Sequence, residues 1–295
     1  MKSLLSLATF FSLLFTVNSV SSADNEGINW QTTFAQLEKE YGGRLGIAAY
    51  DLQHQFQLHY RANERFALCS TFKVLLVANV LHRIDQHQES LSRPIHYDRA
   101  DILDYAPVTK THLDEGVMSV AALSQATLQL SDNTAANLLL KTIGGPEALT
   151  DYLRSIGDNT TRLDRIEPAL NSNLAGDLRD TTTPAAMLAT LNTLLLGDHL
   201  SDVSKQRLIQ WLIGNQTGDD KIRAGVPSTW LVGDKTGSGP NGAFNDVAII
   251  WPETGKPYLL VIYYSESMLT KQKKAELLAK ISESVSKIVF PGLNR

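Results

Sequence analysis

Apolar residues recur along this chain with two different periods, and the period changes twice. Near the N-terminus, apolar and polar residues alternate over 44–52 and 55–62, which is typical of strands. Strand-like runs return at 230–238, 244–252 and 257–265. Because consecutive runs in each group are joined by links of hairpin length, the pattern predicts five strands in one antiparallel sheet.

Between the two groups of strands, from Phe66 to Gly214, the apolar residues follow a helical period. Amphipathic helices are also expected at 30–41, ended by two glycines, and at 270–289. The helices expected in the middle segment are 71–85, 119–130, 134–145, 146–157, 184–197 and 201–214.

These elements predict an α/β fold of the α+β type, with a five-stranded antiparallel sheet covered by the N- and C-terminal helices. Residues 24–65 and 215–295 are expected to form one discontinuous α/β lobe. Residues 66–214 are expected to form an inserted all-helical lobe. Ligands tend to bind in clefts, so the active site is expected between the two lobes.

The first residues have the character of a secretory signal. Lys2 precedes an apolar segment at 4–17, and small residues follow at 19–23. The apolar segment is short for a membrane span, and no later stretch reaches that length. We therefore expect a secreted, periplasmic protein that is cleaved after Ala23, which removes residues 1–23, and that makes no membrane contact afterwards.

Composition argues against several classes of function. The formal net charge is −4, or −5 once Lys2 is removed, and no basic run is longer than 271–274, so no nucleic-acid binding is expected. The seven histidines form no H-E-x-x-H motif and no Cys/His cluster, so neither a metal nor another cofactor is expected. A G-x-G-x-x-G match at 237–242 precedes a strand-like run instead of a helix, which excludes a dinucleotide site. Cys69 is the only cysteine, so it cannot form an internal disulfide and is expected to be a small buried side chain.

Candidate chemistry begins with Ser70 and Lys73, which lie one helical turn apart at the start of an apolar helix. A serine near a helix N-terminus sits at the positive end of the helix dipole. A buried lysine loses its proton more readily than an exposed one and can then activate a serine hydroxyl. The spacing alone is weak, because Ser284 and Lys287 repeat it on a surface-like helix.

A second feature is the run Ser131–Asp132–Asn133 at the junction of two helices. All three residue types cap helices well, and Asp132 is the expected cap. Ser131 and Asn133 would then be free to face a cleft, where a hydroxyl can pass a proton and an amide can hold a carbonyl.

A third feature is the run Lys235–Thr236–Gly237 on an expected strand. A glycine in an inner strand lets a ligand backbone approach closely, and the strand edge can pair with an extended substrate. Lys235 and Thr236 would supply a charge and a hydroxyl for a carboxylate.

The fourth feature is a loop at 162–184 that has no clear period and is long for a compact domain. Glu167 and Asn171 are four residues apart and share a face if this run is helical, so together they can hold and deprotonate one water. Arg165 and Asp180 can close the loop as an ion pair.

These four motifs, in this order and after a signal peptide, closely resemble the class A serine β-lactamases. The resemblance covers essentially the whole mature chain, including the run at 93–109. It implies that Ser70 is the acylated nucleophile, with Lys73 as its proton partner. It also implies that Ser131 passes the proton to the lactam nitrogen and that Glu167 activates the deacylating water. Whether Lys73 or Glu167 takes the first proton stays open.

The same resemblance implies the residues that bind substrate. Asn133 would contact the acyl-amide side chain, and Asn171 would help hold the water. The carboxylate pocket would be Lys235, Thr236 and Ser238, beside Gly237. Tyr105 would form an aromatic wall, and residues 162–180 would be the family's Ω loop. The oxyanion hole would be the backbone N–H groups of Ser70 and Ser238.

Two departures bear on the range of substrates. In one carbapenem-hydrolysing subgroup, the cysteine before the nucleophile forms a disulfide with a second cysteine. This chain has Gly239 at the second position, so that disulfide is absent. Cys69 with Ser238 is instead similar to extended-spectrum members, which favours penicillins and cephalosporins, oxyimino ones included. The family often carries an extra cation near the carboxylate pocket, and Lys221, Arg223 and 271–274 are all candidates.

Two other functions stay open. A D-Ala-D-Ala carboxypeptidase of the penicillin-binding class would share three motifs, but it would lack the Glu167 and Asn171 pair. A β-lactam sensor domain, which stays acylated, would lack the glutamate too and would be membrane-tethered. The expected partners are therefore small β-lactam antibiotics and inhibitors, and the protein is expected to be a monomer.

Overall fold

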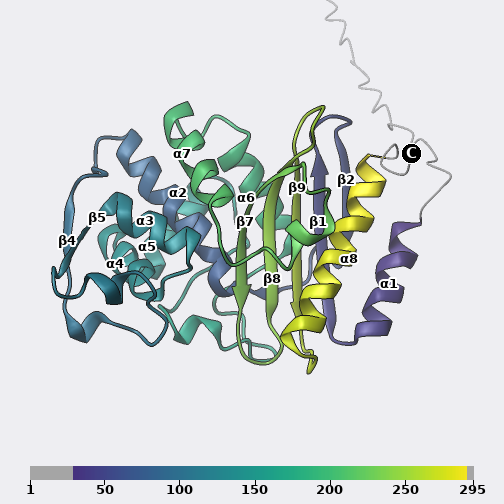
Figure 1. The fold of residues 1–295 in the computed structure, drawn as a ribbon, viewed down its shortest axis with the longest axis horizontal. Coiled ribbons are helices and arrows are strands. Elements are labelled where there is room, and N and C mark those ends of the chain that lie inside the picture. The colour runs from purple at the N-terminus through teal and green to yellow at the C-terminus, as the bar shows by residue number, and fades with distance from the viewer. Residues whose placement is uncertain (1–28, 291–295) are drawn as a thin grey trace, which may run out of the picture.

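The computed structural model describes residues 29–290, so the expected signal peptide lies outside the described residues. Five strands form the central antiparallel sheet in the order β2-β1-β9-β8-β7 (Figure 1). β1 pairs with β9 along its whole length, from Arg44 opposite Ser265 to Asp51 opposite Tyr258. The prediction of one antiparallel sheet built from both ends of the chain is therefore confirmed. The strands are β1 Arg44–Asp51, β2 Phe56–Tyr60, β7 Leu231–Ser238, β8 Phe244–Trp251 and β9 Tyr258–Ser265.

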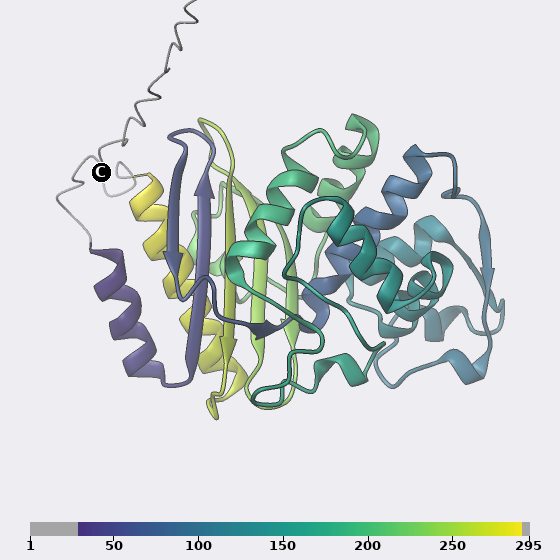
Figure 2. The same ribbon diagram turned by 180° about the vertical axis from the view of Figure 1, so that it is seen from behind.

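Helices cover both faces of this sheet. The terminal helices α1 (Trp30–Tyr41) and α8 (Lys271–Val289) pack together against one face, as Figure 1 shows. The other face is covered by α6 (Pro184–Leu195), which lies over the sheet when it is seen from behind in Figure 2, and by α7 (Asp202–Ile213), which packs against β7. The central strands are consequently buried on both sides, which is why they read as nearly continuous apolar runs.

The remaining helices surround α2 (Phe72–Asp85), in which every residue from Phe72 to Leu81 is buried. Its apolar sequence predicts this position, because a helix that is apolar nearly all round is stable only inside a core. The helices packed around it are α3 Val120–Gln129, α4 Asn133–Ile143 and α5 Pro146–Ser155. None of the helices within residues 29–290 is long and apolar enough to cross a membrane.

The segment expected to be all-helical also contains four short strands, which corrects that detail of the prediction. β3 (Phe66–Ala67) pairs with β6 (Thr181–Thr182), and β4 (Pro94–His96) pairs with β5 (Val117–Ser119). Runs of two or three residues are too short to show a period of two, so their pairing is set by tertiary contacts. The β3–β6 pair joins the start of the helical segment to the end of the loop at 162–180.

Candidate active site

Ser70 lies in a short 3-10 turn, η1 (Cys69–Thr71), that leads directly into α2. Cys69 has a φ of 44°, in the left-handed region that non-glycine residues rarely adopt. The turn packs against β7 so closely that a Cβ on Gly237 would lie 3.0 Å from the Leu68 carbonyl oxygen. A glycine on β7 therefore allows this strand to come close to the serine.

Lys73 follows one turn later and is completely buried. Its Nζ donates to the Ser131 carbonyl at 2.8 Å and to Asn133 Oδ1 at 2.6 Å, and it lies 3.1 Å from Glu167 Oε1. Burial lowers the pKa of Lys73, against the opposing effect of the Glu167 carboxylate. A lysine with a lowered pKa gives up its proton to a neighbour more readily than an exposed lysine does.

Ser131 lies between two ammonium groups. Its Oγ is 3.2 Å from Lys73 Nζ and 3.2 Å from Lys235 Nζ, and Lys235 also donates to the Thr236 carbonyl at 2.9 Å. Burial lowers the pKa of Lys235 to about 7, and the nearby charge of Lys73 adds to that effect. The three side chains form a short chain along which a proton can pass.

Glu167 is almost completely buried, and its carboxylate joins three of the predicted residues. Ser70 Oγ donates to Oε1 at 3.4 Å, and Asn171 Nδ2 donates to Oε2 at 2.5 Å. The structure gives Ser70 no hydrogen bond to Lys73 in the part of the chain that it describes. The base that accepts a hydrogen bond from the Ser70 hydroxyl is Glu167, and the same carboxylate forms an ion pair with Lys73.

Asn137 is a residue that the sequence analysis missed. Its Nδ2 donates to the Glu167 carbonyl and its Oδ1 accepts from the Glu167 N–H, each at 2.9 Å. This amide therefore fixes the backbone of Glu167 from both sides. The available signal was its spacing, since Asn137 follows Asn133 by one turn on the same helix.

Asp132 is fully buried and caps α4, accepting from the Ala135 N–H at 2.8 Å. Its other oxygen accepts from Val108 N and Thr109 N at 2.9 Å each. The cap thus also fixes the neighbouring loop, which carries Tyr105. Half of Tyr105 is exposed.

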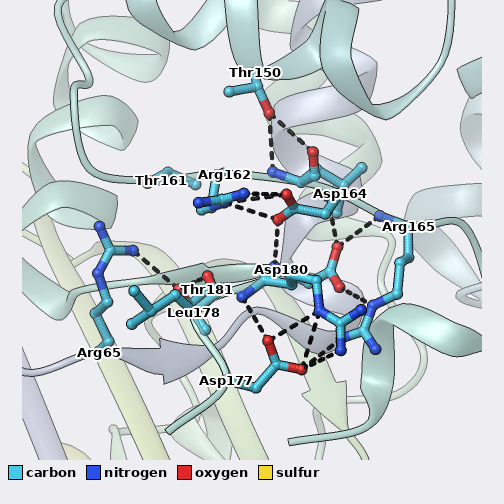
Figure 3. Close-up of polar contacts among 12 residues, drawn as sticks. Arg65, Thr150, Thr161, Arg162, Asp164, Arg165, Asp177, Leu178, Asp180 and Thr181 are labelled. Carbon is cyan, nitrogen blue, oxygen red and sulfur yellow. Dashed lines mark hydrogen bonds and ion pairs between the residues drawn. The ribbon is translucent and has the colours of Figure 1, made fainter.

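The loop at 162–180 is closed at its neck by a buried charge network (Figure 3). Arg165 Nε donates to Asp180 Oδ2 at 2.5 Å, and Asp180 is fully buried. Asp180 Oδ1 accepts from the backbone N–H groups of Asp164 and Arg165 at 2.7 and 2.9 Å. In return, Asp164 accepts from the Asp180 N–H at 3.0 Å. The loop that presents Glu167 is therefore tied at both ends by carboxylates that bind backbone N–H groups.

These elements enclose a cleft with a volume of about 810 Å³ between β7, the loop at 162–180 and the helical segment. Lys73, Glu167 and Lys235 are buried beside it and reach it through Ser70 and Ser131. Cys69 is fully buried next to Gly239, and burial raises the pKa of its thiol. The predicted residues that line the cleft are Ser70, Tyr105, Ser131, Asn133, Asn171, Thr236 and Ser238.

The contacts of Lys221 and Arg223 show which of these two side chains lies near the predicted carboxylate pocket. Arg223 is committed to a buried partner, since its Nε donates to Asp234 Oδ1 at 2.6 Å. Lys221 instead lines the cleft, with Nζ 2.6 Å from the Thr217 carbonyl oxygen. The hydroxyl of Thr217 lies 2.6 Å from that of Thr236. Lys221 is therefore linked to the predicted carboxylate pocket through Thr217, although it also pairs with Asp220 at 3.0 Å. Lys271 and Lys274 of the predicted run line the same cleft. Thr217 is a cleft residue that the sequence analysis did not find.

No group of three or more His, Cys, Asp or Glu side chains within residues 29–290 is placed to hold a metal ion. The cleft contains a serine hydroxyl, two lysines with lowered pKa values and one carboxylate in hydrogen-bonded contact. Such a set suits acyl transfer to and from a serine.

Comparisons with known proteins identify the family of this chain. The model of the family described as "Beta-lactamase enzyme family" matches residues 29–289. The chain is 47% identical to β-lactamase CTX-M-8 of Citrobacter amalonaticus, over 89% of this chain and 88% of that protein. It is 46% identical to β-lactamase OXY-2 of Klebsiella oxytoca, over 90% and 92% of the two chains. A solved ancestral (GNCA) class A β-lactamase superposes with a TM-score of 0.86 at 52% identity, covering 88% of this chain and 99% of that one. The chain therefore belongs to the class A serine β-lactamases, and it is a β-lactam hydrolase.

Proposed function

We propose that this enzyme is secreted to the periplasm as a monomer and opens penicillins and cephalosporins, oxyimino cephalosporins included, through an acyl-enzyme on Ser70. The observation that carries the acyl-enzyme mechanism is the contact of one buried carboxylate, Glu167, with both the serine hydroxyl and the water-holding amide of Asn171. A penicillin-binding protein or a sensor would have neither contact, because it would lack the glutamate.

In acylation, Ser70 Oγ attacks the lactam carbonyl carbon and gives up its proton. The 3.4 Å contact favours Glu167 as the acceptor of that proton, with Lys73 bridging at 3.1 Å. As the C–N bond breaks, Ser131 passes a proton to the lactam nitrogen and is resupplied by Lys73 or Lys235. That lysine regains its proton from Glu167, which lies 3.1 Å from Lys73, so Glu167 is ionised again before deacylation. The backbone N–H groups of Ser70 and Ser238 would stabilise the oxyanion.

In deacylation, Glu167 takes a proton from a water that Asn171 helps to hold, and the hydroxide attacks the ester carbonyl. As the ester bond breaks, Ser70 Oγ takes that proton back from Glu167, and the product leaves. Lys235 and Thr236 hold the substrate carboxylate, with Lys221 as the additional cation. Asn133 holds the amide of the side chain, beside Tyr105.

The test mixes the purified mature enzyme with a chromogenic cephalosporin. Sustained turnover supports the proposal, whereas a single stoichiometric burst would identify a penicillin-binding protein or a sensor. Glu167→Ala should still acylate, but it should release product about 10²- to 10⁴-fold more slowly, the usual worth of a general base. Mass spectrometry should then show the added mass of the acyl group, and Ser70→Ala should show none.

A further inference from the structure

A second cluster of titratable side chains lies outside the cleft, where the end of α2 meets α5 and the connection between α6 and α7. His82 lies in the last turn of α2, Tyr152 lies on α5, and His199 lies in the connection. We propose that His82 and His199 form an acid-sensitive joint, which fastens the connection to α2 while the two rings carry at most one proton and loosens when both are protonated. None of these residues takes part in the proposed β-lactamase mechanism.

The two histidine rings are stacked on each other. Their centroids are 4.5 Å apart and their planes differ by 15°. The ring of Tyr152 completes the cluster, with its centroid 5.6 Å from that of His82 and 5.5 Å from that of His199. Neutral aromatic rings stack favourably, whereas two imidazolium ions at this separation repel each other, and the repulsion is stronger where water is partly excluded.

Each ring also has one nitrogen that is buried and has no hydrogen-bond partner among residues 29–290. These atoms are His82 Nδ1 and His199 Nε2, and the hydroxyl of Tyr152 is buried without a partner in the same range. A protonated imidazole carries an N–H on both of its nitrogens. Protonation of either ring therefore leaves an N–H at a buried position with no acceptor, which is unfavourable.

Asp85 is the carboxylate that acts on this pair. Its Oδ1 accepts from the hydroxyls of Ser201 and Ser204 at 2.7 Å each, and its Oδ2 accepts from the Ser201 N–H at 2.9 Å. Asp85 thus ties the start of α7 to the end of α2, beside the stacked rings. The other carboxylates of this connection, Asp198 and Asp202, are exposed.

These surroundings favour one positive charge on the pair and oppose a second. A cation is stabilised at the C-terminal end of a helix, where His82 lies, and Asp85 attracts it. Burial lowers the pKa of His199, and the charge of His82 lowers that pKa further, although Asp85 raises it. Burial raises the pKa of Tyr152, so this phenol stays neutral, and Arg83, the next residue of α2, adds positive charge.

The unfolded chain therefore binds more protons in mild acid than the folded enzyme does. Two histidines in an unfolded chain titrate near pH 6.5, whereas the folded pair takes up its second proton only at lower pH. The stability that results is complete above about pH 6.5 and declines as the pH falls toward the lowered pKa of His199. One proton fewer on the folded side raises the unfolding equilibrium constant about tenfold for each pH unit in that range.

The test compares the parent enzyme with His199→Gln and with the double variant His82→Gln/His199→Gln. Glutamine has no charge at any pH and keeps polar atoms at the site. The matched control is His96→Gln, which removes an exposed histidine on β4. Urea unfolding at pH values from 5 to 8 gives the equilibrium constant of each enzyme, and its slope against pH gives the number of protons taken up on unfolding.

Between about pH 6.5 and 5, unfolding of the parent should take up about one proton more than unfolding of either variant. Over that range the parent's unfolding constant should rise by up to about 30-fold more than theirs. His96→Gln should keep the parent's slope, because an exposed ring titrates alike in both states. Hydrogen exchange, corrected for its own dependence on pH, should increase first at 196–204 as the parent is acidified.

A double variant with the parent's slope overturns the joint, and so does an equal loss of slope in His96→Gln. NMR titration of the histidine rings in the folded parent needs no variant. One ring of the pair should titrate clearly below about pH 6.5, and two midpoints at or above that value contradict the proposal. Exchange that increases evenly along the chain would show that acid does not loosen this connection.

Discussion

At the scale of single residues, the cleft is organised around two lysines that the fold removes from water. Lys73 and Lys235 are both fully buried, and each lies 3.2 Å from the hydroxyl of Ser131. Burial disfavours the charged form of each, so both pKa values are lowered. The same burial that costs stability makes both lysines give up a proton more readily than exposed lysines do.

Lys235 gives the first prediction, a loss of substrate capture as the pH rises. Its pKa of about 7 in the free enzyme means that the ammonium is present below that pH and is lost above it. Since kcat/KM reports the free enzyme, kcat/KM for a carboxylate-bearing β-lactam should fall as the pH rises past about 7. The kcat should stay flat to higher pH, because a bound carboxylate favours the charged lysine. A pH–rate profile from 5.5 to 9 measures both.

Lys235→Arg is the matched variant, because a guanidinium stays charged throughout this range. The fall in kcat/KM should move beyond the range of the profile. A cephalosporin esterified at its carboxylate is the second control and should show no such fall. If Lys235→Arg keeps the fall at the same pH, a different group, most directly Lys73, is responsible.

The sequence predicted most residues of the cleft because they fall in short motifs, and the chemistry of each motif can be recognised from a few neighbouring residues. It did not predict Asn137, since an asparagine within a helix is ambiguous until its partner, the backbone of Glu167, is known. It also left Lys221, Arg223 and the run 271–274 equivalent as candidates for the extra cation. What sets Arg223 apart is Asp234, eleven residues further along the chain, and only the fold brings that carboxylate to it.

At the scale of elements, the Ω loop is held in place by contacts between its two ends, 164–165 and Asp180, and not by regular secondary structure. It contains only one short 3-10 helix, η4 (Ala169–Asn171), so few backbone hydrogen bonds hold it internally. Asp180 replaces the missing backbone hydrogen bonds, because its carboxylate accepts from two backbone N–H groups and from Arg165. The position of Glu167 is thus coupled to a carboxylate thirteen residues further along the chain.

Asp180→Asn is therefore expected to slow deacylation more than acylation. Asparagine keeps the shape and one acceptor oxygen but removes the buried charge that pairs with Arg165, which leaves the guanidinium with the more distant Asp177, at 3.7 Å. The resulting displacement of Glu167 should slow product release by about 100-fold, the cost of a misplacement of about 1 Å. Mass spectrometry during steady-state turnover should show most of the enzyme acylated, while the initial burst stays fast.

Arg179→Gln is the control for this change. Arg179 also pairs with an Ω-loop carboxylate, Asp177, but it is half exposed, and such surface pairs contribute about 0–1 kcal/mol. Its turnover should match that of the parent. An Asp180→Asn enzyme with parent-like release would show that the neck does not position Glu167.

The pattern predicted the long elements well because each presents several apolar residues to one core. It could not predict β3 and β6, where two residues pair with two across more than a hundred positions of sequence. Their alignment depends on contacts such as the Leu68 N–H donating to the Asp180 carbonyl at 2.9 Å. Those contacts exist only once the Ω loop is folded, so no local pattern records them.

At the scale of the whole molecule, the two expected lobes share one sheet. Successive residues of β8 point into opposite cores: Ile249 packs with the helical segment, whereas Ile250 packs with the terminal helices. The core around α2 thus continues without a break onto the sheet. We expect the lobes to unfold together, because neither can expose its core without uncovering a face of these strands.

Leu76→Ala in α2 and Leu278→Ala in α8 test this expectation, because both leucines are fully buried and lie in opposite cores. Each change should cost about 2–5 kcal/mol, and each kcal/mol should lower the midpoint by about 2–4 °C. Calorimetry should show one transition in the parent and in both variants, with loss of activity following the same curve. Val203→Ala, at an exposed position on α7, should leave the midpoint where it is. Two separate transitions, with each variant moving only one of them, would mean that the lobes are independent folding units.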